Sequence, residues 1–238
     1  MAPPNQLGKR VKLTQVRRPF IVGSTALPFS ETNPRPAGVP DNHTHSWQVF
    51  VKGVEDTDIT YWLRRVQFKL HESIPNYVRM VDGEPGKPFI VNETGWGEFD
   101  IAIKLYYVND SGEKPQTLYH YLRLHPYGRT EEEKQAMIME NGEIRSWSYE
   151  EQLFNEPFDV FYRILTSGAR TAMIPNSNRP GQPFSRETEA AEVKKLRDAQ
   201  TTTEEWSQRI LQELKGKEDL LAKLKAENAA AAAAPKPS

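Results

Sequence analysis

The amino-acid sequence predicts an antiparallel β-sandwich followed by a C-terminal α-helix. In the first two thirds of the 238 residues, short segments alternate apolar with polar side chains and are rich in β-branched and aromatic residues. Residues 187–228 instead consist of helix-forming residues without proline. A parallel α/β fold is not expected, because its long crossover helices find little room before residue 145.

The expected strands follow one another with turn-forming clusters between them. Four segments alternate, namely 47–51 (WQVFV), 66–70 (VQFKL), 99–108 (FDIAIKLYYV) and 118–124 (LYHYLRL). Glycine, proline, asparagine and aspartate gather between them, for example at 82–86 (DGEPG) and 109–112 (NDSG). A last strand at 144–154 and a short helix at 158–165 complete the series, so we expect one sandwich domain over residues 1–168.

Composition separates further parts of the chain. Residues 128–142 are acidic and are expected to form an insert in the sandwich, and the proline-containing residues 169–186 are expected to form a linker. A helix is expected over 187–228 and a low-complexity tail over 229–238. The helix carries an apolar stripe of Ile210, Leu211, Leu214, Leu221 and Leu224. This stripe indicates either a coiled coil with a partner helix or a single helix exposed to solvent.

Charge and composition exclude several classes of protein. The 31 basic and 32 acidic residues leave a net charge of -1, which arises from +2 over 1–127, -5 over 128–168 and +2 over 169–238. A protein that coats nucleic acid is therefore not expected. The absence of cysteine excludes disulfides, thiolate zinc sites and a cysteine nucleophile. No apolar run is long enough for a membrane-spanning helix or a signal peptide, so we expect a soluble intracellular protein.

Two short motifs at strand ends carry the side chains best suited to bind a ligand. In the first, His71 and Ser73 share a face if the strand continues, and an imidazole can orient a hydroxyl. In the second, Gly95 and Gly97 flank Trp96, where glycine permits unusual backbone angles and tryptophan offers a flat apolar wall. Together they can hold a flat, neutral, amide-bearing group. The alternative is that Trp96 and Phe99 belong to the core and His71 caps a turn.

The segments that hold these motifs resemble the YEATS domain family. They are 43–53 (HTHSWQVFVKG), 66–76 (VQFKLHESIPN), 93–107 (ETGWGEFDIAIKLYY) and 119–128 (YHYLRLHPYG). The resemblance covers roughly residues 11–165 in matching order, and LHES and TGWGEF are specific to the family. It implies an all-β immunoglobulin-like sandwich that binds acetylated or crotonylated lysine in histone tails, without catalysis or a cofactor.

The resemblance also implies the residues of a pocket for the acyl-lysine: His43, His71, Ser73, Gly95, Trp96, Gly97 and Phe99. The Ser73 hydroxyl would bind the amide, the Trp96 backbone N–H would meet its carbonyl oxygen, and aromatic and imidazole rings would enclose it. The family often places an aromatic residue after this serine, where the present chain has Ile74.

With its C-terminal helix, the whole chain resembles fungal family members shared by a histone-variant exchange remodeller and a histone acetyltransferase complex. The resemblance implies a nuclear subunit that acts in transcription and DNA repair, with the helix bound to other subunits. The alternative function is an assembly scaffold that acts mainly through this helix and reads acyl-lysine weakly or not at all.

Three weaker patterns have structural explanations that we favour. His43 and His45 can suggest a metal site, but strand-end packing is preferred because no third ligand is placed by local spacing. His45-Ser46 suggests a hydrolase, yet adjacency supplies no positioned base or oxyanion hole. The basic residues Lys9, Arg10, Lys12, Arg17 and Arg18 can touch DNA, although a solvated strand edge is the preferred interpretation.

Overall fold

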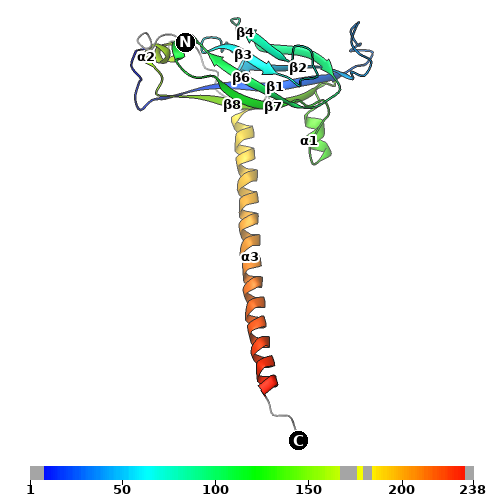
Figure 1. Cartoon of the computed structure of the whole chain (residues 1–238), viewed down its shortest axis with the longest axis vertical. Helices are drawn as coiled ribbons and strands as arrows, with labels where there is room; N and C mark the ends of the chain where they lie inside the picture. Colours follow the sequence, from blue (N-terminus) through cyan, green and yellow to red (C-terminus); the bar gives the residue numbers. More distant parts are fainter. Residues whose placement is uncertain (1–7, 167–175, 179–183, 234–238) are drawn as a thin grey trace. The chain divides into compact units, whose positions relative to one another are not determined.

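Two four-stranded antiparallel β-sheets form the N-terminal part of the chain in this computed structural model (Figure 1). The structure describes residues 8–166, 176–178 and 184–233. One sheet has the order β5-β2-β1-β8 and the other β4-β3-β6-β7. The strands are β1 (Gln15–Pro28), β2 (His45–Gly53), β3 (Leu63–Lys69), β4 (Val78–Asp82), β5 (Phe89–Gly95), β6 (Asp100–Tyr107), β7 (Gln116–Tyr121) and β8 (Ile144–Asn155). The predicted antiparallel sandwich is thereby confirmed.

The core lies between the two sheets and follows from the period of two in each strand. Trp47, Val49 and Val51 of β2 are buried, as are Ile101 and Ile103 of β6, and all five belong to one apolar cluster. The residues between them point to the outer faces. This alternation fixes the register, because a slip by one residue would expose the core side chains.

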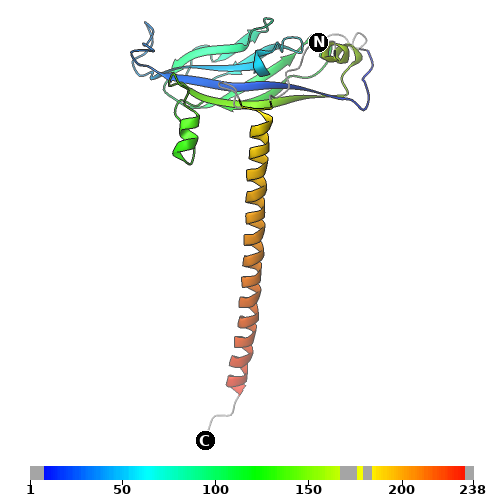
Figure 2. The ribbon, with the colours of Figure 1, turned by 180° about the vertical axis from the view of Figure 1, so that it is seen from behind.

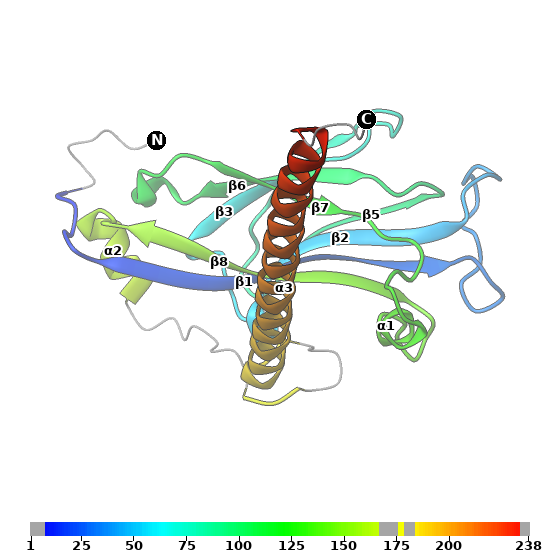
Figure 3. The ribbon, with the colours of Figure 1, turned by 90° about the horizontal axis from the view of Figure 1, so that it is seen from below.

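Strand β1 was not predicted, although it is a central strand that pairs with both β2 and β8 (Figure 3). Its sequence is broken by Pro19 and Gly23, which normally disfavour strands. Gly23 lies between Phe50 of β2 and Trp147 of β8, whose rings meet edge to face at 5.4 Å between centroids. A Cβ at Gly23 would come within 2.7 Å of Trp147 Cδ1, so glycine is required here by packing across the sheet.

The predicted strand edge at the basic N-terminal residues is wrong for Arg18. This arginine is buried in β1, and its guanidinium donates to the backbone oxygen of Leu165. Arg10 forms an ion pair with Glu113 at 3.2 Å. Arg17 forms an ion pair with Glu151 of β8 at 3.6 Å, so three of the five cations contact other parts of the sandwich.

Strands β4 and β5 were also missed, for different reasons. Strand β4 lies at the edge of its sheet, and its Val78 and Met80 are exposed, so its pattern carries no buried apolar face. Strand β5 runs directly into the Gly95–Gly97 motif, which was predicted to lie at a strand end. Its Phe89 and Val91 are buried against the core.

Two short helices lie at opposite ends of the sandwich (Figures 1 and 2). Helix α1 (Glu131–Ala136) forms within the expected acidic insert and begins with a capping box between Thr130 and Glu133. Helix α2 (Asp159–Thr166) follows β8, as predicted, and buries Phe161 and Leu165.

The chain divides into two compact units, Met1–Met173 and Ile174–Ser238. The second unit contains helix α3 (Arg186–Ala233), whose first turn is capped by the Ser185 hydroxyl accepting from the Thr188 N–H at 3.1 Å. The helix runs past residue 228, its expected end, because alanine is the strongest helix former. Most of the expected linker at 169–186, and residues 234–238 of the expected tail, lie outside the described residues.

Every described side chain from residue 189 to 228 is exposed, including the predicted apolar stripe. At about 100° per residue, Ile210, Leu214, Leu221 and Leu224 share one face, while Leu211 lies about 60° outside it. Trp206 and Leu220 extend the stripe. Within the described ranges, neither α3 nor another helix combines the length and apolar composition that crossing a bilayer requires.

Candidate functional site

A cavity of about 270 Å³ opens at the end of the sandwich where β3 and β5 finish and β2 begins. Its lining brings together all seven residues predicted for the pocket, namely His43, His71, Ser73, Gly95, Trp96, Gly97 and Phe99. The remaining lining residues were not predicted from the sequence: Trp47, Pro75, Glu93, Thr94 and Glu98. Ile74 also lines the cavity, at the position where the family often has an aromatic residue. The predicted stripe residues of α3 belong to the second unit.

His71 and Ser73 lie in the turn after β3 rather than on a continuing strand, since β3 ends at Lys69. The His71 Nδ1 and Ser73 Oγ atoms are 2.8 Å apart, and the Ser73 backbone N–H donates to the same nitrogen at 3.3 Å. Because an N–H group can only donate, Nδ1 is the unprotonated nitrogen and the Ser73 hydroxyl donates to it as well. The lone pairs of Ser73 Oγ therefore remain available to accept a hydrogen bond from a ligand.

Arg79 holds this turn against β5. Its guanidinium donates to the backbone oxygens of Pro75, at 2.8 Å, and of Asn76, and it forms an ion pair with Glu93. Asn76 adopts a left-handed backbone with φ of 52°, which asparagine tolerates better than most residues. One cation thus fixes the loop that presents His71 and Ser73.

Trp96 projects from the loop after β5 and is 64% exposed, so it is not a core residue. Its backbone N–H has no hydrogen-bond acceptor among the described residues. The expectation of unusual backbone angles at the flanking glycines is wrong, because neither has positive φ. At Gly95 the requirement is space, since a Cβ there would lie 3.2 Å from Trp47 Nε1.

His43 and His45 take part in separate contacts that do not resemble a metal site. The His43 Nδ1 atom lies 2.8 Å from Thr94 Oγ1, and His45 Nδ1 lies 2.8 Å from Thr44 Oγ1. Among the described residues, no group of three potential ligands gathers as a metal site would require. The Thr44 N–H donates to the Gly95 oxygen at 3.0 Å, so residues 43–45 brace the loop that carries Trp96.

Phe99 forms the apolar base of the cavity. Its ring meets Trp47 edge to face at 5.9 Å and lies 5.8 Å from the His71 ring. Ile74 and Phe99 are both partly buried against the core. These contacts make the side of the cavity that adjoins the core apolar.

Glu98 joins the Trp96 loop to the segment after β7. One carboxylate oxygen accepts the backbone N–H groups of Leu124 at 2.8 Å and His125 at 3.1 Å, and the other accepts from Arg123 at 3.3 Å. Burial alone raises the pKa of Glu98, but these hydrogen bonds and the Arg123 charge lower it overall. The glutamate of TGWGEF could have been singled out by its place inside the motif.

The pKa of His45, near Glu98, is lowered mainly by burial and to a smaller extent by His125. The two imidazole rings meet edge to face at 5.1 Å between centroids. Glu98 opposes this shift. The neutral imidazole is thus favoured beneath the Trp96 loop.

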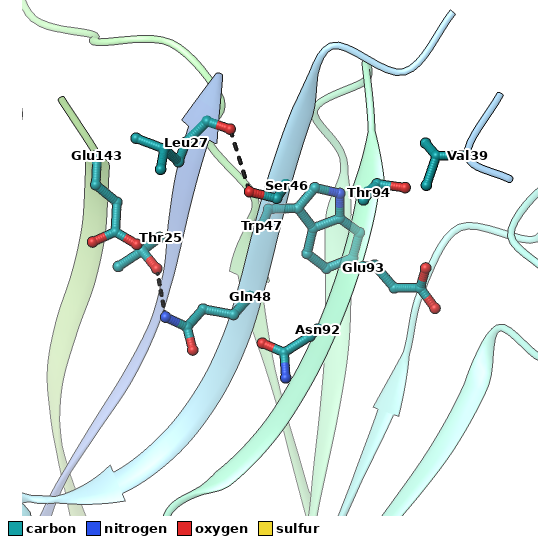
Figure 4. A pocket seen from close by; sticks show the side chains of 10 residues that line it. All are labelled: Thr25, Leu27, Val39, Ser46, Trp47, Gln48, Asn92, Glu93, Thr94 and Glu143. Atoms are coloured by element: carbon teal, nitrogen blue, oxygen red, sulfur yellow. Dashed lines mark hydrogen bonds between the residues drawn. The ribbon is translucent and has the colours of Figure 1, made fainter. Parts of the chain in front are cut away.

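A second hollow adjoins the cavity on the outer face of the β5-β2-β1-β8 sheet. This open groove of about 470 Å³ is lined mostly by hydroxyl, amide and carboxylate side chains (Figure 4). It shares Trp47, Glu93 and Thr94 with the lining of the first cavity. The two hollows therefore meet along the end of β5.

The model of the YEATS family matches residues 42–126, which include every predicted pocket residue. A "Protein AF-9 homolog" of Gibberella zeae is 72% identical over 99% of this chain and 100% of the relative. A protein of the same description from Saccharomyces cerevisiae is 37% identical, over 82% of this chain and 87% of its own.

Solved structures are similar as well. The crystal structure of the Yaf9 YEATS domain bound to H3K27ac is 42% identical, with a TM-score of 0.56 over 67% of this chain and 99% of that one. The Yaf9 YEATS domain recognizing an H3K122suc peptide is 40% identical, with a TM-score of 0.53 over the same shares.

Proposed function

This chain belongs to the YEATS family, and on that premise we propose that its cavity binds acylated lysine in histone tails. The observation that carries the proposal is the Ser73 hydroxyl, oriented by His71, in one cavity with the exposed ring of Trp96. The solved relatives with acetylated and succinylated H3 peptides support the same ligand class.

The two polar ends of an acyl-lysine amide match two unused groups of the cavity. The amide N–H donates to Ser73 Oγ, whose own proton is directed to His71. The amide oxygen accepts from the backbone N–H of Trp96, which has no other acceptor among the described residues. Both ends of the amide are paired on binding, so its burial leaves no unsatisfied polar atom.

An unmodified lysine is disfavoured because its ammonium finds no free carboxylate in the cavity. Glu93 is paired with Arg79 and Glu98 with Arg123, so both nearby negative charges are already compensated. An ammonium would lose its water shell without a full counter-charge, whereas the neutral amide loses much less. The planar acyl group adds contact area against Trp96.

Replacing Trp96 tests this function directly. In the full-length protein, Trp96→Ala is expected to weaken binding of an acetylated or crotonylated histone-tail peptide by about tenfold or more, because the stacking wall is lost. Titration of the acylated and unmodified peptides measures the effect. Trp206→Ala removes a tryptophan of nearly equal exposure from α3 and is the matched control. Equal binding of both peptides by the wild type would refute the function.

A second candidate function, assembly of chromatin complexes, rests on the exposed apolar stripe of α3. An isolated helix gains little from such a stripe, so a partner helix is the better explanation. We propose that α3 joins the protein to a nuclear histone-variant exchange remodeller and to a histone acetyltransferase complex. There the acyl-lysine pocket would serve transcription and DNA repair.

Deletion of residues 187–238 is expected to remove the protein from these complexes while leaving the pocket intact. Leu214→Asp combined with Leu221→Asp should do the same, because both residues lie within the stripe. Leu211→Asp is the control, because this exposed leucine, although predicted as part of the stripe, lies about 60° outside the face that Leu214 and Leu221 share. Purification of the associated subunits measures incorporation, and retention of the deleted form would exclude α3 as the assembly element.

A further inference from the structure

The groove on the outer face of the β5-β2-β1-β8 sheet is built from two rows of side chains. Pairing aligns Leu27, Ser46 and Thr94 in one row and Thr25, Gln48 and Asn92 in the next. Each row crosses β1, β2 and β5, as Figure 4 shows. The groove therefore runs across the strands and begins at Thr94, which also lines the acyl-lysine pocket.

Polar groups along the groove are available to a ligand. Gln48 donates to Thr25 at 2.9 Å, which leaves the Gln48 carbonyl oxygen free of any partner among the described residues. The Asn92 amide is exposed and has no hydrogen bond within the same residues. Such amides, with both donors and acceptors, suit the backbone of an extended polypeptide.

Glu143 lines the far end of the groove, directly before β8 (Figure 4). It forms no ion pair or side-chain hydrogen bond among the described residues. Burial lowers the pKa of Arg145, and the nearby charge of Glu143 opposes this with a smaller effect. Residues 128–145 carry five glutamates and three basic residues, so this end of the groove keeps a net negative charge and favours a cationic ligand.

The spacing of the strands gives the separation between the two ends. Glu143 directly precedes β8, and β8 is three strand spacings from β5. At about 4.8 Å per spacing this is about 14 Å, which an extended chain covers in about four residues.

We propose that this groove binds the part of the histone chain that flanks the acyl-lysine, with a lysine or arginine about four residues away paired to Glu143. The inference rests on the proposed function, and the groove adjoins the pocket because both are lined by Thr94. It adds a second specificity element: the pocket selects the acyl group, and Glu143 selects its sequence context.

Peptides that differ in one charge test the proposal with the full-length protein. Each carries a central acetyl-lysine and, four residues away on one side or the other, either arginine or glutamine. For one of the two sides we expect the arginine peptide to bind about fivefold more tightly. Glu143→Gln should abolish this difference and leave the affinity for the glutamine peptide unchanged.

Glu140→Gln is the matched control, because it removes the same charge from the same acidic segment outside the groove. The proposal is overturned if arginine gives no advantage on either side, or if Glu140→Gln abolishes the advantage as fully as Glu143→Gln. Failure of the underlying function is distinguishable, because the unmodified peptides would then bind the wild type as tightly as the acetylated ones.

Discussion

The hydroxyl of Ser73 owes its direction to His71, and the two side chains therefore act as one binding group. In their 2.8 Å contact the Ser73 hydroxyl donates its hydrogen to the imidazole nitrogen, which leaves the oxygen lone pairs available to a ligand. Loss of either residue should have nearly the same consequence for an amide ligand. A serine without the histidine is free to rotate, and a histidine without the serine leaves the amide N–H unpaired.

We expect Ser73→Ala and His71→Ala each to weaken binding of acylated peptide by about fivefold to tenfold. The double variant should lose little more affinity than the single variant that binds less tightly, since both residues contribute to one interaction. Titrations of the wild type and three variants form the double-mutant cycle, with Ser148→Ala as a control at an exposed serine of β8. Fully additive losses would mean that the two residues contribute independently.

His120 couples the two sheets through a buried contact. Its Nε2 atom lies 2.8 Å from the hydroxyl of Ser24 on β1, and both residues are buried. Burial lowers the pKa of His120 to about 4, against a weaker opposite effect of Asp100. The folded protein thus holds this histidine neutral under conditions in which the unfolded chain protonates it.

This shift predicts a loss of stability in mild acid. Above the unfolded value of about 6.5, both states are neutral and His120 has no effect. As the pH falls from there toward about 4, only the unfolded state gains the proton, so the free energy of unfolding decreases by up to ~3 kcal/mol. Urea denaturation at pH 7 and pH 5 measures this decrease in the wild type and its expected absence from His120→Gln. An identical pH dependence in the variant would contradict the assignment.

At the scale of elements, two loops depend on arginine–carboxylate pairs that lie behind the ligand-binding groups. Arg79 with Glu93 holds the turn after β3, and Arg123 with Glu98 holds the loop after β5. Glu98 also accepts two backbone N–H groups, so it ties the loop after β5 to the segment after β7 by three hydrogen bonds. Neither pair needs to contact the ligand to determine the shape of its pocket.

Glu98→Ala should therefore weaken acylated-peptide binding by about fivefold, because the loop that carries Trp96 loses its attachment. Glu98→Gln keeps an oxygen acceptor for the backbone N–H groups and should recover most of the affinity. Peptide titration gives the affinities, and thermal unfolding of both variants provides the control for stability. Equal affinity of the alanine variant and the wild type would show that the loop is held by other contacts.

The strands that could be predicted are those with a buried face and a regular alternation. Strands β2, β3, β6 and β7 have both, and their segments were found from the sequence to within a few residues. The strand predicted at 144–154 is β8, which ends one residue later. Strand β1 was not predicted because Pro19 and Gly23 break the alternating pattern. The glycine at position 23 is explained by the rings of Phe50 and Trp147, which leave no room for a side chain between them. Local sequence carries no information about such packing between strands.

The cavity was predicted more completely than the fold around it, because its motifs resemble those of a known family. His71 and Ser73 interact within a turn, so their contact depends on local sequence alone. Arg79 and Glu98 were missed because their farthest partners lie 14 and 27 residues away. Contacts across that distance follow from topology and not from periodicity.

For the whole molecule, the two compact units predict separable behaviour. A chain that ends at residue 168 should bind acylated peptide with the affinity of the full-length protein, because every pocket residue lies in the first unit. Its urea unfolding midpoint should also be unchanged. Peptide titration and denaturation of both forms check this, and a weaker short form would mean that the second unit contributes to the site.

The exposure of Trp96 also gives the molecule an optical signal of its own. Trp47 and Trp62 are buried, and Trp147 is half-buried against Phe50. Of the five indoles, only those of Trp96 and Trp206 lie largely in water. When an acyl group covers Trp96, its emission should move to shorter wavelength. A Trp206→Phe variant would then report the filling of the pocket by intrinsic fluorescence, without a label on either partner.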